Sequence, residues 1–122
     1  MTNWMTELKE KSRMEVEIWY AAFEPKPIHV ATMQLPGTAN EDVLEPAFEF
    51  TQNNDEPWIE VHQDKLLWLM ECKGLRSMSV GDFIRLEDGS IFQVVPVGFT
   101  QVPNMEPVPQ RAGSTLIDRN VV

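Results

Sequence analysis

Few side chains in this sequence have the chemistry of a catalytic group. Cys72 is the single cysteine, and His29 and His62 are the two histidines. A Cys–His pair could supply a nucleophile and its base, but these residues lie in unrelated segments and match no motif. A lone cysteine also leaves no internal disulfide and no zinc spacing. We therefore expect Cys72 to be a small, buried or half-buried side chain, and we expect no cofactor or metal.

Acidic side chains are concentrated in the centre of the chain. The net charge is -9, and the segment 41–64 contains no Lys or Arg. Its acidic residues are Glu41, Asp42, Glu45, Glu49, Asp55, Glu56, Glu60 and Asp64. General acid–base chemistry needs two carboxylates that converge in a pocket with separated pKa values, and nothing in this spacing indicates such a pair. Calcium and phosphate-binding loop patterns are missing too, so we predict that the protein is not an enzyme.

This acidic segment has two interpretations. It is either a solvated helix face that keeps the protein soluble, or a surface that occupies a basic site on another protein. Glu41, Glu45 and Glu49 recur at four-residue steps, which would align them on one face of a helix. Because phosphate backbones are bound by Lys and Arg, we expect no direct contact with nucleic acid.

Length and hydropathy predict one cytoplasmic domain. The chain has 122 residues, and no apolar run approaches the ~20 residues of a membrane span. The N-terminal segment 1–13 lacks the apolar centre of a signal peptide.

The best specified element is a hairpin within residues 77–99. Asp88-Gly89 separates two apolar runs, 83–86 and 91–95, and tolerates the positive φ angles of tight turns. A two-residue loop would pair Leu86 with Ile91 but would set an Arg against a Phe, whereas a three-residue loop with a bulge would change that pairing. The register stays open at this point.

A second hairpin is expected near the N-terminus. Residues 14–23 alternate, with Met14, Val16, Ile18 and Tyr20 on one face and Glu15, Glu17 and Trp19 on the other. Residues 28–34 return as a strand with Ile28 and Val30 inward. A short helix over 3–12 precedes this hairpin.

The central segment predicts two helices. Val43, Leu44, Ala47 and Phe48 share a helical face, and Thr38 with Glu41 matches a capping box. Pro46 means that this helix either kinks there or begins near it. Residues 63–74, QDKLLWLMECKG, read as the second helix because they contain strong helix formers and no β-branched residue.

That second segment is apolar on nearly all sides, so it is either buried in the core or in contact with a partner or second copy. Its apolar side chains are Leu66, Leu67, Trp68, Leu69 and Met70. The residues that we expect to contact a partner are Trp58, which precedes this segment, and Leu66, Trp68, Leu69 and Met70 within it. With Glu41, Glu45 and Glu49 they form our candidate partner-binding set.

The predicted fold is α+β. A small antiparallel sheet of about four strands, from residues 14–34 and 83–102, carries one or two helices on one face. We place a single domain at 1–102 and an irregular, proline-containing tail at 103–122.

The segment RSMSVGDFIRLEDGSIFQVVPVGF, preceded by PAFEFTQNNDEPW, resembles a group of small phage, plasmid and mobile-element proteins related to the YodL-like group. The matching positions are Ser77, Ser79, Val80, Gly81, Asp82, Asp88, Gly89, Gly98 and Phe99. The similarity spans 14–100, and this chain departs from the group in its longer 58–74 segment and in both ends. Since the group has no established activity, the resemblance implies origin and fold. We interpret Ser-Val-Gly-Asp itself as a structural turn into a strand.

Three functions follow from these observations. The first is a phage or mobile-element accessory protein that binds and modulates a host protein, such as a defence-system or transcription component. The second is an acidic DNA mimic that blocks a nucleic-acid-binding site. A small enzyme is the third and weakest.

Overall fold

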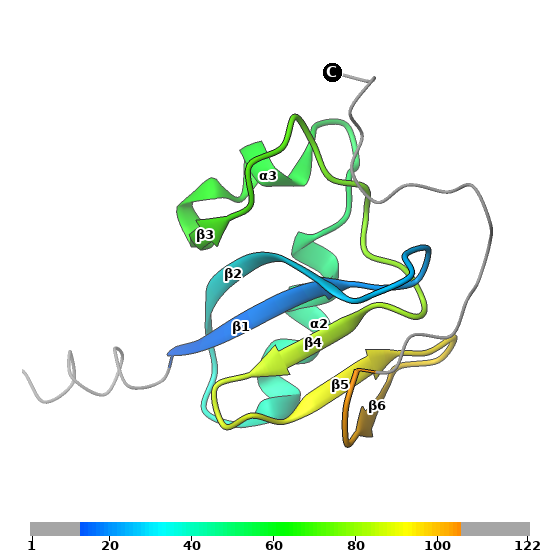
Figure 1. The fold of residues 1–122 in the computed structure, drawn as a ribbon. Helices are drawn as coiled ribbons and strands as arrows, with labels where there is room; N and C mark the ends of the chain where they lie inside the picture. The colour runs from blue at the N-terminus through cyan, green and yellow to red at the C-terminus, as the bar shows by residue number, and fades with distance from the viewer. Residues whose placement is uncertain (1–12, 106–122) are drawn as a thin grey trace, which may run out of the picture.

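The computed structural model describes residues 13–105. Within them, six strands form one antiparallel sheet in the order β3-β2-β1-β4-β5-β6 (Figure 1). The strands are β1 (Arg13–Tyr20), β2 (Ile28–Pro36), β3 (Leu66–Leu69), β4 (Phe83–Leu86), β5 (Ile91–Val94) and β6 (Phe99–Val102). Helix α2 (Asn40–Phe50), the short helix α3 (Trp58–Val61) and the 3-10 turn η1 (Gln63–Lys65) lie between β2 and β3. The predicted α+β class is confirmed, but the sheet is larger than the about four strands expected.

The N-terminal hairpin follows the predicted alternation. Val16, Ile18 and Tyr20 of β1 are fully buried. In β2 the burial alternates less cleanly, because the register shifts between Ile18 and Trp19 and both Val30 and the residue after it are buried. The β1–β2 pair therefore supplies one apolar face to the core and one mixed face to the other side of the sheet.

The C-terminal hairpin has the three-residue loop. Arg85 pairs with Ile91, and the backbone N–H of Leu86 donates to the carbonyl oxygen of Ser90 at 2.9 Å. Gly89 follows with φ +92°, a conformation that favours glycine. In the turn between β5 and β6, the backbone N–H of Val95 donates to the carbonyl oxygen of Gly98 at 3.1 Å, and Gly98 has φ +89°. Both glycines therefore hold backbone positions that set the register of this half of the sheet.

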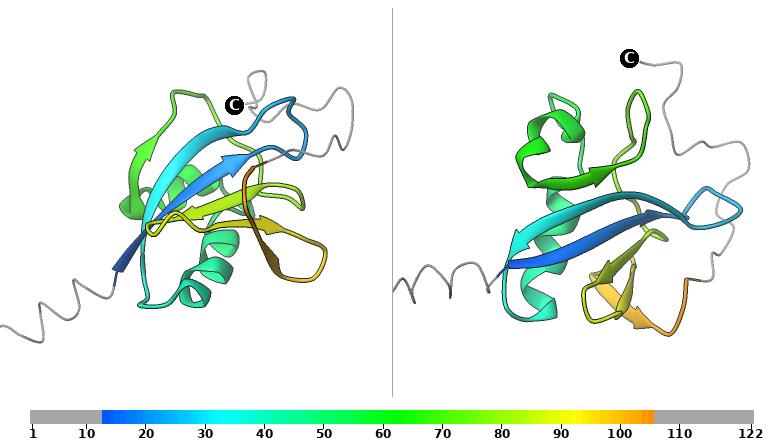
Figure 2. Two further views of the ribbon diagram at one scale, coloured as in Figure 1. Left: turned by 60° about the horizontal axis from the view of Figure 1, so that its bottom comes forward. Right: turned by 60° about the vertical axis from the view of Figure 1, so that its left-hand side comes forward.

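Helix α2 covers one face of the sheet and contacts β1, β2 and β4 (Figures 1 and 2). Val43, Leu44 and Ala47 are its buried residues, as the helical period predicts. The cap differs from the prediction, since Asp42 rather than Glu41 accepts the backbone N–H groups that precede the helix. Pro46 lies inside the helix, so the alternative of a start near Pro46 is wrong.

The helix predicted for 63–74 is wrong. The chain makes the turn η1 and then the strand β3, which pairs with β2 at the edge of the sheet. Helix propensity is a weak preference, and the open edge of β2 offers the apolar run a partner for its backbone hydrogen bonds. Leu66 and Leu69 then pack against the core.

The structure does not describe the first twelve residues or most of the predicted tail. The short helix over 3–12 lies outside the described residues, as does the tail beyond 105. None of the helices in 13–105 has the length and apolar character that a membrane crossing requires.

Candidate functional site

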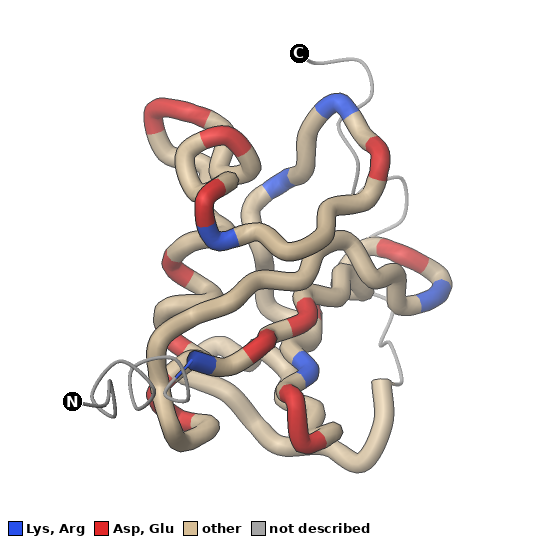
Figure 3. The backbone as a smooth tube through the Cα atoms, turned by 90° about the vertical axis from the view of Figure 1, so that its left-hand side faces the viewer, with Lys and Arg blue, Asp and Glu red and all other residues tan. Residues whose placement is uncertain are grey.

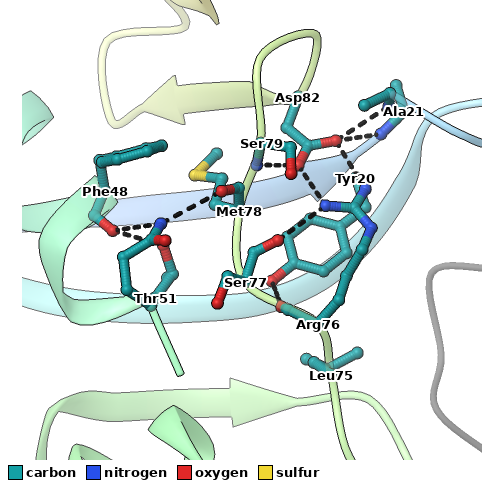
Figure 4. A network of polar contacts seen from close by, with 12 residues as sticks. Tyr20, Ala21, Phe48, Thr51, Leu75, Arg76, Ser77, Met78, Ser79 and Asp82 are labelled. Carbon is teal, nitrogen blue, oxygen red and sulfur yellow. Dashed lines mark hydrogen bonds and ion pairs between the residues drawn. The ribbon is translucent and has the colours of Figure 1, made fainter. Parts of the chain in front are cut away.

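The Ser-Val-Gly-Asp segment ends in a fully buried carboxylate, Asp82. One of its oxygens accepts hydrogen bonds from the backbone N–H groups of Ala21 and Ala22, at 2.8 and 2.9 Å. The other oxygen accepts one from the backbone N–H of Ser79 at 2.8 Å. Asp82 therefore joins the entry of β4 to the β1–β2 turn, which supports the structural interpretation of this motif (Figure 4).

Arg76 completes the surroundings of Asp82. Its Nη1 lies 2.7 Å from Oδ2 of Asp82 and its Nη2 lies 2.9 Å from Oδ1. The guanidinium also lies over the Tyr20 ring, 4.1 Å from its centroid, and over the Phe23 ring at 4.9 Å. A carboxylate offers about four lone-pair positions, and the three backbone donors and two guanidinium nitrogens take them up. The Asp82 carboxylate is therefore held by internal donors and serves the fold.

Trp58 belongs to the core, which corrects its place in the candidate partner-binding set. Its side chain is fully buried, and its Nε1–H donates to the backbone oxygen of Arg76 at 3.3 Å. The hydroxyl of Tyr20 donates to the same oxygen. Burial of the phenol raises the pKa of Tyr20 well above its ordinary value. Trp58 is thus enclosed by the core, where it stabilises the fold and has no exposed surface for a partner.

Cys72 and the two histidines have separate surroundings. Cys72 is half-buried, and burial raises the pKa of its thiol, which reduces the thiolate that a nucleophile needs. The ring of His62 lies against Phe50 at 4.6 Å, and burial lowers its pKa, with a further contribution from the charge of Lys65. The contacts of His29 are with β1, β2 and β3. The described contacts therefore bring no Cys–His pair together.

Three ring side chains form a row on the sheet face opposite α2, which we call the aromatic row: Trp19, His29 and Trp68. His29 is stacked between the other two, with ring centroids 5.1 Å from Trp19 and 4.6 Å from Trp68. Its Nε2 lies 2.8 Å from the hydroxyl of Thr32, and the Trp19 Nε1–H donates to Glu17 at 2.8 Å. These contacts fix the three ring planes on β1, β2 and β3.

The outer end of the aromatic row lies at the edge of the sheet. Trp68 is 47% exposed and its neighbour Leu67 is 52% exposed. Leu66, Leu69 and Met70 are partly buried against the core. Trp68 is therefore the one candidate partner-binding residue of this segment with a largely exposed side chain. Its neighbour Leu67, which was not among the candidates, is exposed beside it.

The predicted acidic row is present on α2. Glu41, Glu45 and Glu49 are all exposed on this helix, and α2 contains no basic residue. Figure 3 shows further Asp and Glu positions in the loops around the sheet. In residues 13–105, no group of three or more His, Cys, Asp or Glu side chains is arranged to hold a metal ion.

Sequence reasoning missed the Arg76–Asp82 pair and the aromatic row. Arg76 carried no signal, because its partner is identified only when the β1–β2 turn and the entry of β4 meet in space. One residue of the aromatic row could have been identified from the sequence. The alternation of β1 places Trp19 outward with Glu15 and Glu17, and a large aromatic side chain at such a position indicates a contact on that face.

Comparison of the chain with protein-family models, with curated proteins and with solved structures gives no match in any of the three.

Proposed function

We propose that this protein is an accessory protein of a phage or mobile element that binds and modulates a host protein in the bacterial cytoplasm. The observation that carries the binding role is Trp68, a large aromatic side chain half exposed at the sheet edge and held by the aromatic row. The Ser-Val-Gly-Asp resemblance supports the origin. The Asp82 carboxylate and the Tyr20 hydroxyl both form hydrogen bonds inside the protein, which supports a binding protein over an enzyme.

Trp68 has the properties of an interface anchor. Tryptophan is among the residues most enriched at interface positions where truncation costs ~2 kcal/mol or more. Because His29 already fixes one face of the indole, little side-chain entropy remains to be lost when a partner covers the other face. The adjacent Leu67 extends the apolar surface.

Recognition would proceed through these side chains more than through the backbone of β3. The strand has four residues, and its pairing with β2 skips Leu67, so that this residue is an extra one in the ladder. Short length and bulges both make an edge strand a poor template for an added strand. The exposed side chains of Trp68 and Leu67 then provide the contact surface.

Affinity capture from the native host tests this proposal. The tagged full chain is compared with Trp68→Ala and with a control, Thr100→Ala, which truncates an exposed side chain of β6 at the opposite edge of the sheet. We expect the captured host protein to be lost or weakened by about 30-fold for Trp68→Ala and retained for the control. Equal capture by both variants would show that this surface is not the binding site.

A second copy of the chain is the alternative occupant of this surface. Light scattering on the purified wild-type chain over a concentration series separates the two cases. A dimer that Trp68→Ala converts to a folded monomer would assign the edge to self-association.

The acidic row supports a second candidate, the DNA mimic. Three exposed carboxylates follow one face of α2 with a rise of ~6 Å per step. Their field reaches ~8 Å at physiological salt, so binding to a basic partner should weaken steeply as salt rises.

Calorimetry across a salt series, on the wild type and on Glu41→Gln/Glu45→Gln/Glu49→Gln, tests mimicry once a partner is known. The substitutions keep the helix and remove the charge. A salt-insensitive affinity that the triple variant leaves unchanged would exclude the mimic and favour Trp68.

A further inference from the structure

A second surface lies on the opposite side of the sheet from the aromatic row, between α2 and the β5–β6 hairpin. It is a hollow of about 390 Å³ that we call the α2–β6 hollow. Phe48 of α2 and Phe99 of β6 contribute apolar wall, with their rings edge to face at 6.4 Å. Val94, which is almost fully buried, and Val95 add aliphatic surface from β5. The volume falls in the range of sites that enclose small ligands or peptide side chains.

Two carboxylates stand at this apolar surface, those of Glu45 and Glu49. They are four residues apart on α2 and therefore lie on the same side of the helix. In the described part of the chain, neither forms an ion pair, and the lining of the hollow includes no Lys or Arg. The hollow thus combines an apolar wall with negative charge that the protein itself does not neutralise.

These carboxylates are unfavourable for the helix that carries them. Like charges four residues apart repel each other, and Glu49 lies in the last turn, where the helix dipole favours cations. No basic residue occupies that turn. Glu41 differs, because in the first turn its charge is favourable. A cation placed between Glu45 and Glu49 would relieve both unfavourable effects.

We propose that the α2–β6 hollow binds a short basic and apolar segment of a partner protein, with one Arg or Lys side chain between Glu45 and Glu49. The long aliphatic stem of such a side chain covers apolar surface while its charged end reaches the carboxylates. A neighbouring apolar residue of the segment lies on Phe99. The inference rests on the proposed function in supposing a protein partner, and it names the chemistry of a contact separate from Trp68.

Binding of a side chain in the hollow and long-range DNA mimicry require different sets of glutamates. Glu41 is part of the acidic row but does not line the hollow. A field effect depends on all three residues, whereas a seated side chain depends on Glu45 and Glu49. Glu41→Gln is therefore a matched control of identical chemistry on the same helix.

Nuclear magnetic resonance titration of the full chain tests the inference without knowledge of the partner. The probe is the peptide acetyl-Leu-Arg-Leu-amide, and its neutral counterpart carries Gln in place of Arg. We expect saturable shifts of backbone amides in 45–49 and 94–99, with a dissociation constant on the order of 1 mM. The Gln peptide should bind about tenfold more weakly, as should the Arg peptide to Glu45→Gln/Glu49→Gln, and Glu41→Gln should bind like the wild type.

Several results would overturn the inference. They are an absence of saturable shifts in these two segments, equal binding of the Gln peptide, or a loss with Glu41→Gln as large as with the double variant. The proposed function fails separately, through unchanged host-protein capture by Trp68→Ala. If the peptide binds the hollow and Trp68→Ala still captures the host protein, then the hollow is the binding surface and the β3 edge is not.

Discussion

Asp82 and Arg76 form a two-pronged ion pair in the interior, with nitrogen–oxygen distances of 2.7 and 2.9 Å. Asp82 has no exposed surface, and the Arg76 side chain is 17% exposed. Since the same carboxylate accepts the backbone N–H groups of Ala21 and Ala22, the pair fixes the β1–β2 turn against the entry of β4. The stability of the sheet therefore depends on a charge pair that is largely removed from water.

Removing Asp82 alone should destabilise the fold strongly. Asp82→Ala leaves the guanidinium of Arg76 without its partner and three backbone N–H groups without an acceptor. Breaking one side of a buried pair costs ~3–5 kcal/mol, a large part of the ~5–15 kcal/mol stability of a small domain. Urea unfolding followed by circular dichroism measures this loss.

The matched comparison is Arg76→Leu, alone and combined with Asp82→Ala. The double variant should lose less than the sum of the single variants, because neither partner is left charged and alone. A cost below ~1 kcal/mol for Asp82→Ala would show that the pair is not a structural centre.

The two central tryptophans should behave oppositely. Trp58→Ala opens a cavity in the core and should cost ~3–5 kcal/mol, whereas Trp68→Ala removes mainly a ring stack worth ~0.5–1.5 kcal/mol. Thermal unfolding of the two variants, each compared with the wild type, checks the difference. Unfolding of Trp68→Ala at ordinary temperature would place Trp68 in the core as well and remove the basis of the β3 edge surface.

We expect the protein to lose stability at alkaline pH because Tyr20 is buried in its neutral form. Its pKa is raised in the folded state by burial, so the unfolded chain releases the phenol proton first as pH rises. The stabilisation is therefore complete below the unfolded pKa of ~10 and is lost progressively as pH rises from there toward the higher folded pKa.

Ultraviolet absorbance can follow this titration directly, since Tyr20 is the single tyrosine of the chain. Phenolate absorbance should appear together with loss of the circular dichroism signal, at a pH above that of free tyrosine. Ionisation at the ordinary pH with the fold intact would contradict the burial of this hydroxyl. Tyr20→Phe is the control for absorbance changes that come from the tryptophans.

The glutamates of the α2–β6 hollow should lower the stability of the free protein. Glu45→Gln/Glu49→Gln removes like-charge repulsion and an unfavourable dipole contact, so we expect the melting temperature to rise by about 1–3 °C. Glu41→Gln should lower it slightly, because Glu41 lies in the first turn. Differential scanning calorimetry at low salt provides the measurement, and a fall for the double variant would mean that these side chains have stabilising contacts.

Several parts of the site could be anticipated and others could not. The exposed acidic face of α2 follows from four-residue spacing, and the structural role of Asp82 follows from the turn chemistry of Ser-Val-Gly-Asp. The partner of Asp82 could not be foreseen, because Arg76 meets it across a turn whose path depends on β1. Trp58 lies in the acidic stretch NDEPWIEVHQD and Trp68 in the apolar run LLWLM, yet Trp58 is the buried ring and Trp68 the exposed one, so only packing decides between them.

The sequence by itself determined the elements whose information is local. The alternation of β1, the apolar face of α2 and the Asp88-Gly89 turn depend on neighbours in the chain, and each is found where the pattern predicts. Tertiary structure decided what residues 63–74 became. Their helix propensity is worth only tenths of a kcal/mol per residue, whereas pairing with the free edge of β2 satisfies backbone hydrogen bonds and buries Leu66 and Leu69. That competition made a strand of the segment and brought Trp68 onto His29.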